Sequence, residues 1–346
     1  MDSAPSPASR LSVVIPVHNR ADLAAQCLAA LARWTTPLEI LVVDDGSTDP
    51  GVPLLHRTGL GEQDGHAWRW LRNPEARGFS AAINRGLTEA TGDLLLLLNS
   101  DAEVTEGGDH RIREAFTEDR RQGGQLGALA ARLVYPNGLP QWSGGAFPTH
   151  LWLFALASGL GRGARFRVRK GPPSGFTGGT VDWAPGAALA ISREAFEEVG
   201  PFDESYRHYA QDLDYCQRLA RAGRTVRVLG DWIVVHHLGG SVGQISDLAS
   251  AHRSEEPGPL ASSPAAAPNT GYDGQRLDLL WLDLLHWARR HRGARWAHRA
   301  RRALLLGGRL RQLLLAKRRG TPEARAVDAA INAITAITAL RRSSPT

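Results

Sequence analysis

The sequence predicts an α/β fold built around a parallel sheet, and two observations support this prediction. Short apolar runs rich in Val, Ile and Leu alternate with segments in which apolar residues recur at helical spacing. One of the runs, residues 94–98, consists of five leucines, which is typical of a strand buried on both faces of a sheet. We therefore expect strands and helices to alternate through the first half of the chain.

The expected elements follow in chain order. Strands are expected at residues 11–16, 39–43, 68–72, 94–98, 126–135, 181–192, 225–229 and 232–236. Helices are expected at residues 21–34, 80–90, 193–199 and 212–222. Residues 136–180 are dense in Gly and show no clean period, which favours a functional loop region within a compact domain.

The composition changes at about residue 247. Residues 255–269 are rich in Pro, Ala and Ser, as flexible linkers are. Residues 275–319 are rich in Leu, Trp and Arg, and both this segment and residues 321–342 are expected to be helical. The predicted organisation is a disordered N-terminus (1–10), an α/β domain (11–246), a linker (247–274) and a basic helical C-terminal region (275–346).

Composition narrows the classes of partner and compartment. The chain has 346 residues, a net charge of +6 and a pI of about 9.9, which favours an anionic partner such as a nucleotide diphosphate, an anionic lipid surface or a nucleic acid. Its two cysteines, Cys27 and Cys216, argue against a disulfide framework or a Cys-based zinc site. No apolar signal core and no run of eighteen apolar residues occur, so we expect a cytoplasmic protein without a spanning helix.

Polar residues gather where three of the apolar strands end. The groups are Pro16-Val17-His18-Asn19, Asp44-Asp45-Gly46-Ser47 and Asn99-Ser100-Asp101. In an open parallel sheet, ligands bind at the carboxyl ends of the strands, so these groups predict one site. Oxygen ligands such as Asp101 suit Mg²⁺ or Mn²⁺ with a bound diphosphate. The Asp44 segment can equally be a turn followed by a helix cap.

Two further segments carry candidate chemistry. Asp212 and Asp214 open a predicted helix, where they either stabilise the helix N-terminus or provide a general base toward an acceptor hydroxyl. His236 and His237 follow a Val-rich strand, where one of them is either a structural histidine or a metal ligand.

In this order, the segments resemble the family 2 glycosyltransferases, and the rhamnosyltransferase-like branch most closely. The matching segments are residues 13–31, 44–47, 73–86, 99–101, 183–203, 212–218 and 236–241, so the resemblance covers about residues 11–243. It implies a GT-A fold, in which a Rossmann-like nucleotide-binding half is fused to an acceptor-binding half. It also implies metal-dependent transfer of a sugar from a nucleotide diphosphate to a hydroxyl group by a single displacement that inverts the anomeric centre.

The resemblance also implies a role for each matching residue. The nucleotide-sugar pocket would be formed by Pro16, His18, Asn19, Asp45, Arg77, Gly78, Phe79, Asn84, Asn99 and Ser100. Asp101 would bind Mn²⁺ or Mg²⁺ together with His236, with His237 as the alternative. Trp183, Gly186 and Gln211 would lie by the sugar and acceptor, and Asp212 would be the catalytic base.

The branch resemblance favours dTDP-rhamnose as the donor, with UDP- and GDP-sugars open. The acceptor would be a saccharide, a lipid-linked glycan or a small-molecule glycoside. Family members usually carry Glu before the base, where this chain has Gln211. The neutral amide removes a negative charge, which should lower the pKa of Asp212. The alternatives are a sugar-nucleotide-forming nucleotidyltransferase, which the Gly-free turn after the first strand opposes, and an inactive GT-A-fold binding protein.

The C-terminal helices interleave Leu and Trp with arginines between residues 281 and 319. Packing on the α/β domain or homodimer formation is the first interpretation. The second is contact with an anionic membrane at the inner face, which would suit a lipid-linked acceptor. No nucleic-acid-binding motif accompanies the basic residues, so nucleic acid is not expected as a partner.

Overall fold

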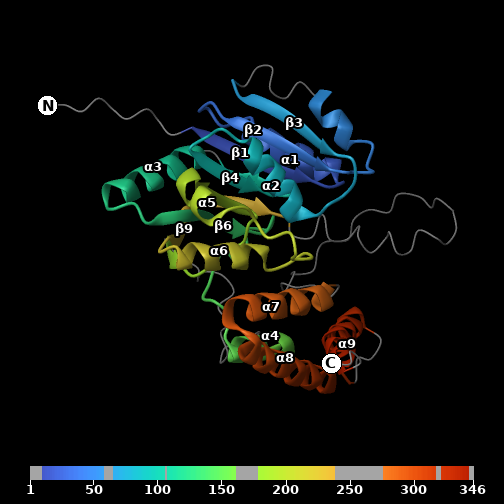
Figure 1. The fold of residues 1–346 in the computed structure, drawn as a ribbon. Coiled ribbons are helices and arrows are strands. Elements are labelled where there is room, and N and C mark those ends of the chain that lie inside the picture. The colour runs from blue at the N-terminus through green and yellow to red at the C-terminus, as the bar shows by residue number, and fades with distance from the viewer. Residues whose placement is uncertain are drawn as a thin grey trace.

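The computed structural model describes residues 10–57, 65–105, 107–160, 178–237, 276–316 and 321–342. They form a nine-stranded sheet with helices on both faces and a layer of further helices beneath it (Figure 1). The strands are β1 (Leu11–Val17), β2 (Glu39–Asp45), β3 (Ala67–Asn73), β4 (Leu94–Leu98), β5 (Ala102–Val104), β6 (Leu126–Val134), β7 (Gly178–Val181), β8 (Ala188–Ser192) and β9 (Thr225–His236). The helices are α1 (Ala21–Leu31), α2 (Phe79–Glu89), α3 (Gly108–Arg121), α4 (His150–Ser158), α5 (Arg193–Val199), α6 (Gln211–Arg221), α7 (Leu277–Arg292), α8 (Ala294–Leu314) and α9 (Pro322–Arg342), with a 3₁₀ turn at Val52–Arg57.

The strand order is β3-β2-β1-β4-β8-β6-β9-β5, with β7 paired to β9. The first four strands run parallel, as predicted. The other half is mixed, because β8 runs antiparallel to both β4 and β6, and β5 and β7 run antiparallel to β9. The prediction of a parallel sheet is therefore wrong for this half. A strand buried on both faces has the same apolar pattern in either direction, so composition predicts burial and not direction.

Each face of the sheet has its own hydrophobic core, because successive side chains of a strand point to opposite faces. Val13 and Ile15 of β1 belong to the core that also contains residues of α1 and α3. Val14 belongs to the other core, which contains residues of α2, α5 and α6. This second core continues into α4, α7, α8 and α9, so the C-terminal helices share a core with the α/β part.

Several boundaries differ from the sequence-based expectations. The strand expected at residues 181–192 is two strands, β7 and β8, with a turn between them that carries Trp183 and Gly186. The two short strands expected at 225–229 and 232–236 form one strand, β9, whose pairing with β6 shifts register between Ala131 and Arg132. That irregularity accommodates Gly230, Asp231 and Trp232, which lie between the paired residues Leu229 and Ile233.

Helix α4 was not expected, since it lies in the Gly-dense stretch that shows no period. Its sequence, HLWLFALAS, is apolar all round, and a helix of this kind carries no amphipathic signal. The helix packs against α8, and Leu153, Ala155 and Ala157 are buried. Strand β5 and helix α3 were also not expected. The predicted linker, 247–274, lies outside the described residues.

The helices expected near the C-terminus are present as α7, α8 and α9, which pack against one another. Helix α7 also contacts α6. Among the described helices, none is long and apolar enough to cross a membrane.

Candidate functional site

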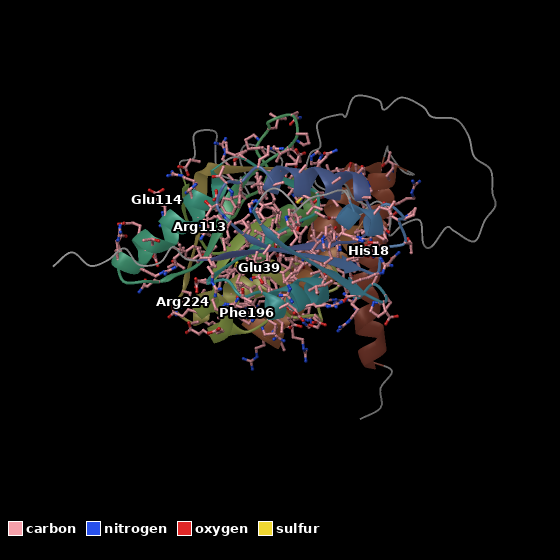
Figure 2. All side chains as sticks on the ribbon, turned by 90° about the horizontal axis from the view of Figure 1, so that it is seen from above. His18, Glu39, Arg113, Glu114, Phe196 and Arg224 are labelled. Carbon is pink, nitrogen blue, oxygen red and sulfur yellow. The ribbon has the colours of Figure 1, made fainter. Side chains whose placement is uncertain are left out.

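The carboxyl ends of β1, β2 and β4 meet at one edge of the sheet, because the three strands are parallel neighbours. In the β1–β2 register, Val17 lies opposite Asp44. Figure 2 shows His18 at the opposite side of the molecule from Arg113 and Glu114 of α3. The structure thus gathers the predicted polar segments at one place.

Asn19 joins the turn after β1 to the turn after β2. Its backbone, at a φ of 59°, has the left-handed conformation that Asn tolerates better than most residues. The Asn19 Oδ1 atom accepts hydrogen bonds from the N–H groups of Thr48 (2.8 Å) and Asp49 (2.9 Å). The Asn19 N–H donates to Ser47 Oγ at 2.8 Å. His18 Nδ1 donates to the Asp45 carbonyl at 2.8 Å, which fixes its imidazole at this edge.

The two aspartates after β2 both have partners within the protein. The Asp45 carboxylate is 4% exposed and accepts from Asn73 Nδ2 (2.7 Å) and from the N–H groups of Arg77 (3.0 Å) and Gly78 (2.7 Å). Asp44, which had no assigned contact, accepts from Ser47 N at 2.8 Å and pairs with Arg72. The turn interpretation accounts for these bonds, and a contact between Asp45 and a nucleotide base stays a prediction.

Gly46 provides a stability test of this turn. It has a φ of +63°, and a Cβ there would lie 2.4 Å from the backbone carbon of Glu75. We expect Gly46→Ala to lower the free energy of unfolding by about 3 kcal/mol, from left-handed strain and the backbone clash together. Gly65→Ala is the matched control, since Gly65 has a φ of +75° and no atom of the described part of the chain within 4 Å of the added Cβ. It should cost only about 1 kcal/mol in urea denaturation; equal losses in the two variants would contradict the clash.

The segment at the start of α2 is tied to the loop that precedes α6. Asn84 Nδ2 donates to the Phe202 carbonyl (2.8 Å) and to Glu204 Oε1 (3.0 Å), and Asn84 Oδ1 accepts from Phe202 N (2.8 Å). Arg77 pairs with Glu204 at 3.3 Å. The Asn84 amide therefore holds a loop, and its predicted role toward the nucleotide would be indirect.

Asp101 and His236 come together although they lie far apart in the sequence. The His236 Nε2 atom is 3.2 Å from Asp101 Oδ1, because β5 pairs with β9 next to the end of β4. His236 Nδ1 lies 3.0 Å from the buried acceptor Gln141 Oε1, which orients the ring so that Nε2 faces Asp101. A deprotonated Nε2 in this orientation could bind a cation together with the carboxylate. His237 points elsewhere and pairs with Glu103 at 2.6 Å.

These residues fit a hard divalent cation that shares its shell with a ligand. Asn99 Oδ1 is buried and has no hydrogen-bond partner among the described residues, so a further potential ligand lies beside the pair. Burial alone would raise the pKa of Asp101, but the hydrogen bond and charge of His236 outweigh it and hold that pKa below its usual range. In the described part of the chain, no group of three His, Cys, Asp or Glu side chains could enclose a metal alone. Mg²⁺ and Mn²⁺ commonly complete such a shell with substrate phosphate and water.

Asp212 lies at the first turn of α6 and accepts hydrogen bonds from the N–H groups of Leu213 (2.8 Å) and Gly186 (3.2 Å). Burial raises the pKa of Asp212 to about 6, which outweighs these two bonds. The next residue after Gly186, Ala187, accepts from the Asn99 N–H at 2.9 Å. Two consecutive residues thus connect the Asp212 carboxylate to the segment that carries Asp101.

The remaining predicted residues surround this connection. A Cβ on Gly186 would lie 3.8 Å from the Phe79 ring, so the start of α2 reaches the same place. Trp183 is 8% exposed, donates from Nε1 to the Ala146 carbonyl (3.2 Å) and packs edge-on against Trp142. Gln211 Oε1 is buried, and no described residue forms a hydrogen bond to it.

Sequence reasoning missed three residues that support the site. They are Gln141, which orients His236, Glu204, which holds Arg77 and Asn84, and Glu103, which holds His237. Gln141 lies in the stretch without a period, and no local pattern connects it to β9. The pairing of β5 with β9 brings Glu103 to His237, and strand pairing of this kind cannot be deduced from either segment alone.

The chain is similar in sequence to known glycosyltransferases. Residues 12–143 match the family model described as glycosyl transferase family 2. The chain is 27% identical over 236 residues to the O-antigen biosynthesis protein RfbC of Myxococcus xanthus. The alignment covers 66% of this chain and only 17% of that protein. It is 28% identical over 271 residues to the N-acetylglucosaminyl-diphospho-decaprenol L-rhamnosyltransferase of Mycobacterium tuberculosis, covering 70% of this chain and 82% of that protein.

A solved structure has a similar fold. The mannosyltransferase PcManGT of Pyrobaculum calidifontis, solved with GDP-Man and Mn²⁺, superimposes with a TM-score of 0.53 at 19% identity. The alignment covers 98% of this chain and 83% of that one. At this identity the likeness concerns the fold, which is the GT-A fold with a helical C-terminal part.

Proposed function

We propose that this chain, a member of glycosyltransferase family 2, transfers a sugar from a nucleotide diphosphate to an acceptor hydroxyl. The transfer inverts the anomeric centre, and Asp212 is the base. One observation carries the proposal: Gly186 and Ala187 join the Asp212 carboxylate directly to the Asn99–Asp101 segment. A base for the acceptor and a cation site for the diphosphate must lie on either side of the anomeric carbon in a single displacement. The backbone connection keeps these two groups at a fixed separation.

The nucleotide sugar would lie across the carboxyl ends of β1, β2 and β4. His18 would stack on the base, while Asn19 and Asp45 would shape the pocket by holding its two turns and the Arg77-Gly78 segment. Asn99, Asp101 and His236 would hold Mn²⁺ or Mg²⁺. When bound, the cation would neutralise charge on the diphosphate leaving group.

Asp212 would remove the proton from the acceptor hydroxyl as that oxygen attacks the anomeric carbon. Its raised pKa supports this role, because a carboxylate with a pKa nearer neutrality is a stronger base. The N–H groups of Gly186 and Leu213 orient the carboxylate. The unpartnered Gln211 oxygen beside it would accept a hydrogen bond from the acceptor.

The pH profile gives a direct test of the base. Asp212 acts when deprotonated and its folded pKa is about 6, so kcat/KM for the acceptor should fall about tenfold per pH unit below pH 6 and level off above it. Gln211→Glu places a like charge beside the base and raises the pKa of Asp212. The fall in kcat/KM should then begin at a higher pH. A kcat/KM that stays constant from pH 5 to pH 7.5 would exclude Asp212 as the base.

For the donor we propose dTDP-rhamnose first and UDP- or GDP-sugars next, from the likeness to the mycobacterial L-rhamnosyltransferase. The acceptor would be a saccharide, a lipid-linked glycan or a small-molecule glycoside. A screen of dTDP-rhamnose, UDP-glucose, UDP-N-acetylglucosamine and GDP-mannose with Mn²⁺, read by thermal shift, would identify the donor, since a ligand that binds the folded state raises its stability.

The outer surface of α8 supports a location at the inner face of the membrane. Leu306, Leu313 and Leu314 are exposed there, together with Arg302 and Arg309. Apolar side chains flanked by arginines are what an anionic lipid surface attracts. Alternatively, the same surface of α8 would form a homodimer. Sedimentation with phosphatidylglycerol vesicles distinguishes membrane binding from homodimer formation.

A further inference from the structure

Asp283 of α7 lies beneath the loop that leads into α6. Its carboxylate is 1% exposed. Asp283 Oδ1 accepts from the Arg207 N–H (3.2 Å), and Oδ2 accepts from the N–H groups of His208 (3.0 Å) and Tyr209 (2.8 Å). Three consecutive backbone donors of one loop therefore converge on a single side chain of the C-terminal region.

This loop determines where α6 begins. The next residue, Ala210, has a φ of 63°, which an alanine adopts only when its surroundings enforce it. Gln211 and Asp212 follow directly in the first turn of α6. Because the backbone at Ala210 is left-handed and leads directly into α6, a small shift of residues 207–209 would rotate the first turn of α6. The Asp212 side chain would rotate with it.

A second set of bonds from α7 holds the other side of α6. Asp214 is fully buried and accepts from His291 Nε2 at 2.6 Å, with Arg290 Nε at 3.3 Å. Tyr206 donates to the same carboxylate at 3.1 Å. Burial alone would raise the pKa of Asp214, but the bond from His291 and the charge of Arg218 lower it, so the carboxylate stays ionised.

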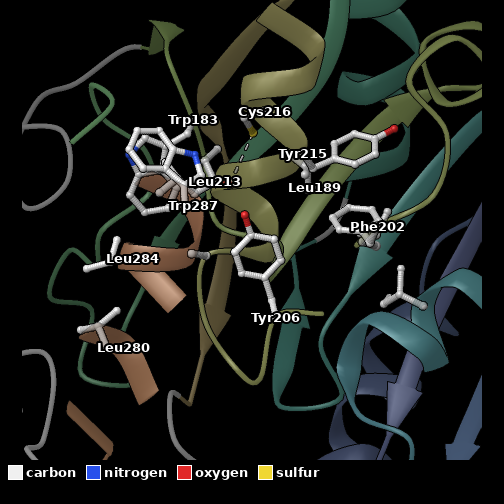
Figure 3. Close-up of a cluster of buried hydrophobic side chains, with 14 of the residues drawn as sticks. Trp183, Leu189, Phe202, Tyr206, Leu213, Tyr215, Cys216, Leu280, Leu284 and Trp287 are labelled. Carbon is white, nitrogen blue, oxygen red and sulfur yellow. Dashed lines mark hydrogen bonds between the residues drawn. The ribbon is translucent and has the colours of Figure 1, made fainter. Parts of the chain in front are cut away.

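Apolar packing joins the same two helices. Figure 3 shows Leu213 of α6 in one cluster with Leu284 and Trp287 of α7, and Tyr206 beside them. Trp287 is fully buried and Leu284 is 3% exposed. The start of α6 thus rests on α7 through both polar and apolar contacts.

We propose that Asp283 is a positioning residue for the transfer reaction. By fixing the N–H groups of residues 207–209, it sets the orientation of the Asp212 carboxylate toward the acceptor hydroxyl. The Asp214 bonds to His291 and Arg290 keep α6 in register while it does so. The inference rests on the proposed role of Asp212 as base, and it makes α7 a part of the catalytic unit.

The test compares two acid-to-amide changes on one helix. In Asp283→Asn, the Nδ2 group faces an N–H donor of the loop, so one bond becomes a repulsion and the negative charge is lost. In the control, Asp278→Asn, the acid lies in the first turn of α7 and pairs with Arg276 at 3.8 Å. Its charge acts on Tyr209, as that of Asp283 does, whereas it is Asp283 that binds the N–H groups of the loop. We expect Asp283→Asn to lower kcat by about 10- to 100-fold with an unchanged Kd for the donor, since small misplacements of a catalytic group have such effects.

Two measurements are made on the full chain with Mn²⁺. The first is nucleoside diphosphate release from dTDP-rhamnose, or from the UDP- or GDP-sugar that turns over. The second is hydrogen exchange, which should accelerate at residues 207–213 in Asp283→Asn and stay unchanged in Asp278→Asn. Asp283→Ala, which removes all three bonds, should accelerate exchange at residues 207–213 further.

The outcomes are distinct for each idea. If Asp212→Asn still turns over at the wild-type rate, the proposed function fails. If Asp212→Asn is inactive while Asp283→Asn keeps the wild-type kcat and exchange pattern, the positioning role alone fails. A parallel loss of kcat, donor affinity and thermal stability in Asp283→Asn would also overturn it, because that pattern describes a general structural role.

Discussion

Asp212→Asn should reduce kcat about 1,000-fold while leaving donor binding intact, the range expected when a general base is removed. The amide has nearly the same shape, and its oxygen still accepts a hydrogen bond from Leu213 N or Gly186 N. The variant loses the ability to take a proton and one of these two bonds, because the amide nitrogen cannot accept. The measurement is single-turnover transfer at saturating donor, with the donor Kd obtained separately by calorimetry.

The thermal stability of Asp212→Asn is the control for this experiment. Burial raises the folded-state pKa of Asp212 to about 6, above its ordinary value of 3.8. The ionised carboxylate is therefore disfavoured in the folded protein, and stability falls as pH rises from about 4 to 6. The neutral amide should thus leave Tm at pH 7 unchanged or higher. A loss of donor affinity on this substitution would remove Asp212 from the base role.

Asp101→Ala should weaken Mn²⁺-dependent donor binding by about 100-fold or more, since even the loss of a residue that supports a metal ligand commonly costs 10- to 100-fold. His236→Ala should act in the same direction, because His236 Nε2 lies 3.2 Å from the Asp101 carboxylate. The measurement is a Mn²⁺ titration followed by donor binding. An unchanged titration in Asp101→Ala would contradict the proposed cation site.

His237→Ala and Glu103→Ala are the matched controls for that experiment. Glu103 lies on β5 and His237 directly follows β9, but the two side chains pair with each other at 2.6 Å. Neither substitution should change the Mn²⁺ titration. A larger effect in His237→Ala than in His236→Ala would reverse the assignment.

Much of the site could be predicted because it depends on one rule of topology. Parallel strands end at a common edge, so polar residues directly after apolar runs must meet there. This rule places His18, Asp45 and Asp101 near one another without knowledge of side-chain contacts. The start of α6 was also readable to within one residue, because the acidic residues Asp212 and Asp214 open a segment of helical spacing.

The rest depends on contacts between distant segments. The choice between His236 and His237 is a choice between two faces of a strand, and the pairing of β9 with β5 and β6 decides it. The bonds that Asp45 makes to Arg77 and Gly78 depend on how the chain returns after β3. Asp283 and Gln141 lie in segments without a local signature of function, so only the folded chain relates them to Asp212 and His236.

The most direct test of the account is transfer itself. The full chain is incubated with Mn²⁺, dTDP-rhamnose, UDP- and GDP-sugars and a set of p-nitrophenyl glycosides as acceptors. We expect release of nucleoside diphosphate coupled to a glycosylated acceptor of inverted anomeric configuration, lost when EDTA removes the metal. Pyrophosphate chemistry, donor binding without turnover, or transfer that EDTA does not affect would contradict the account.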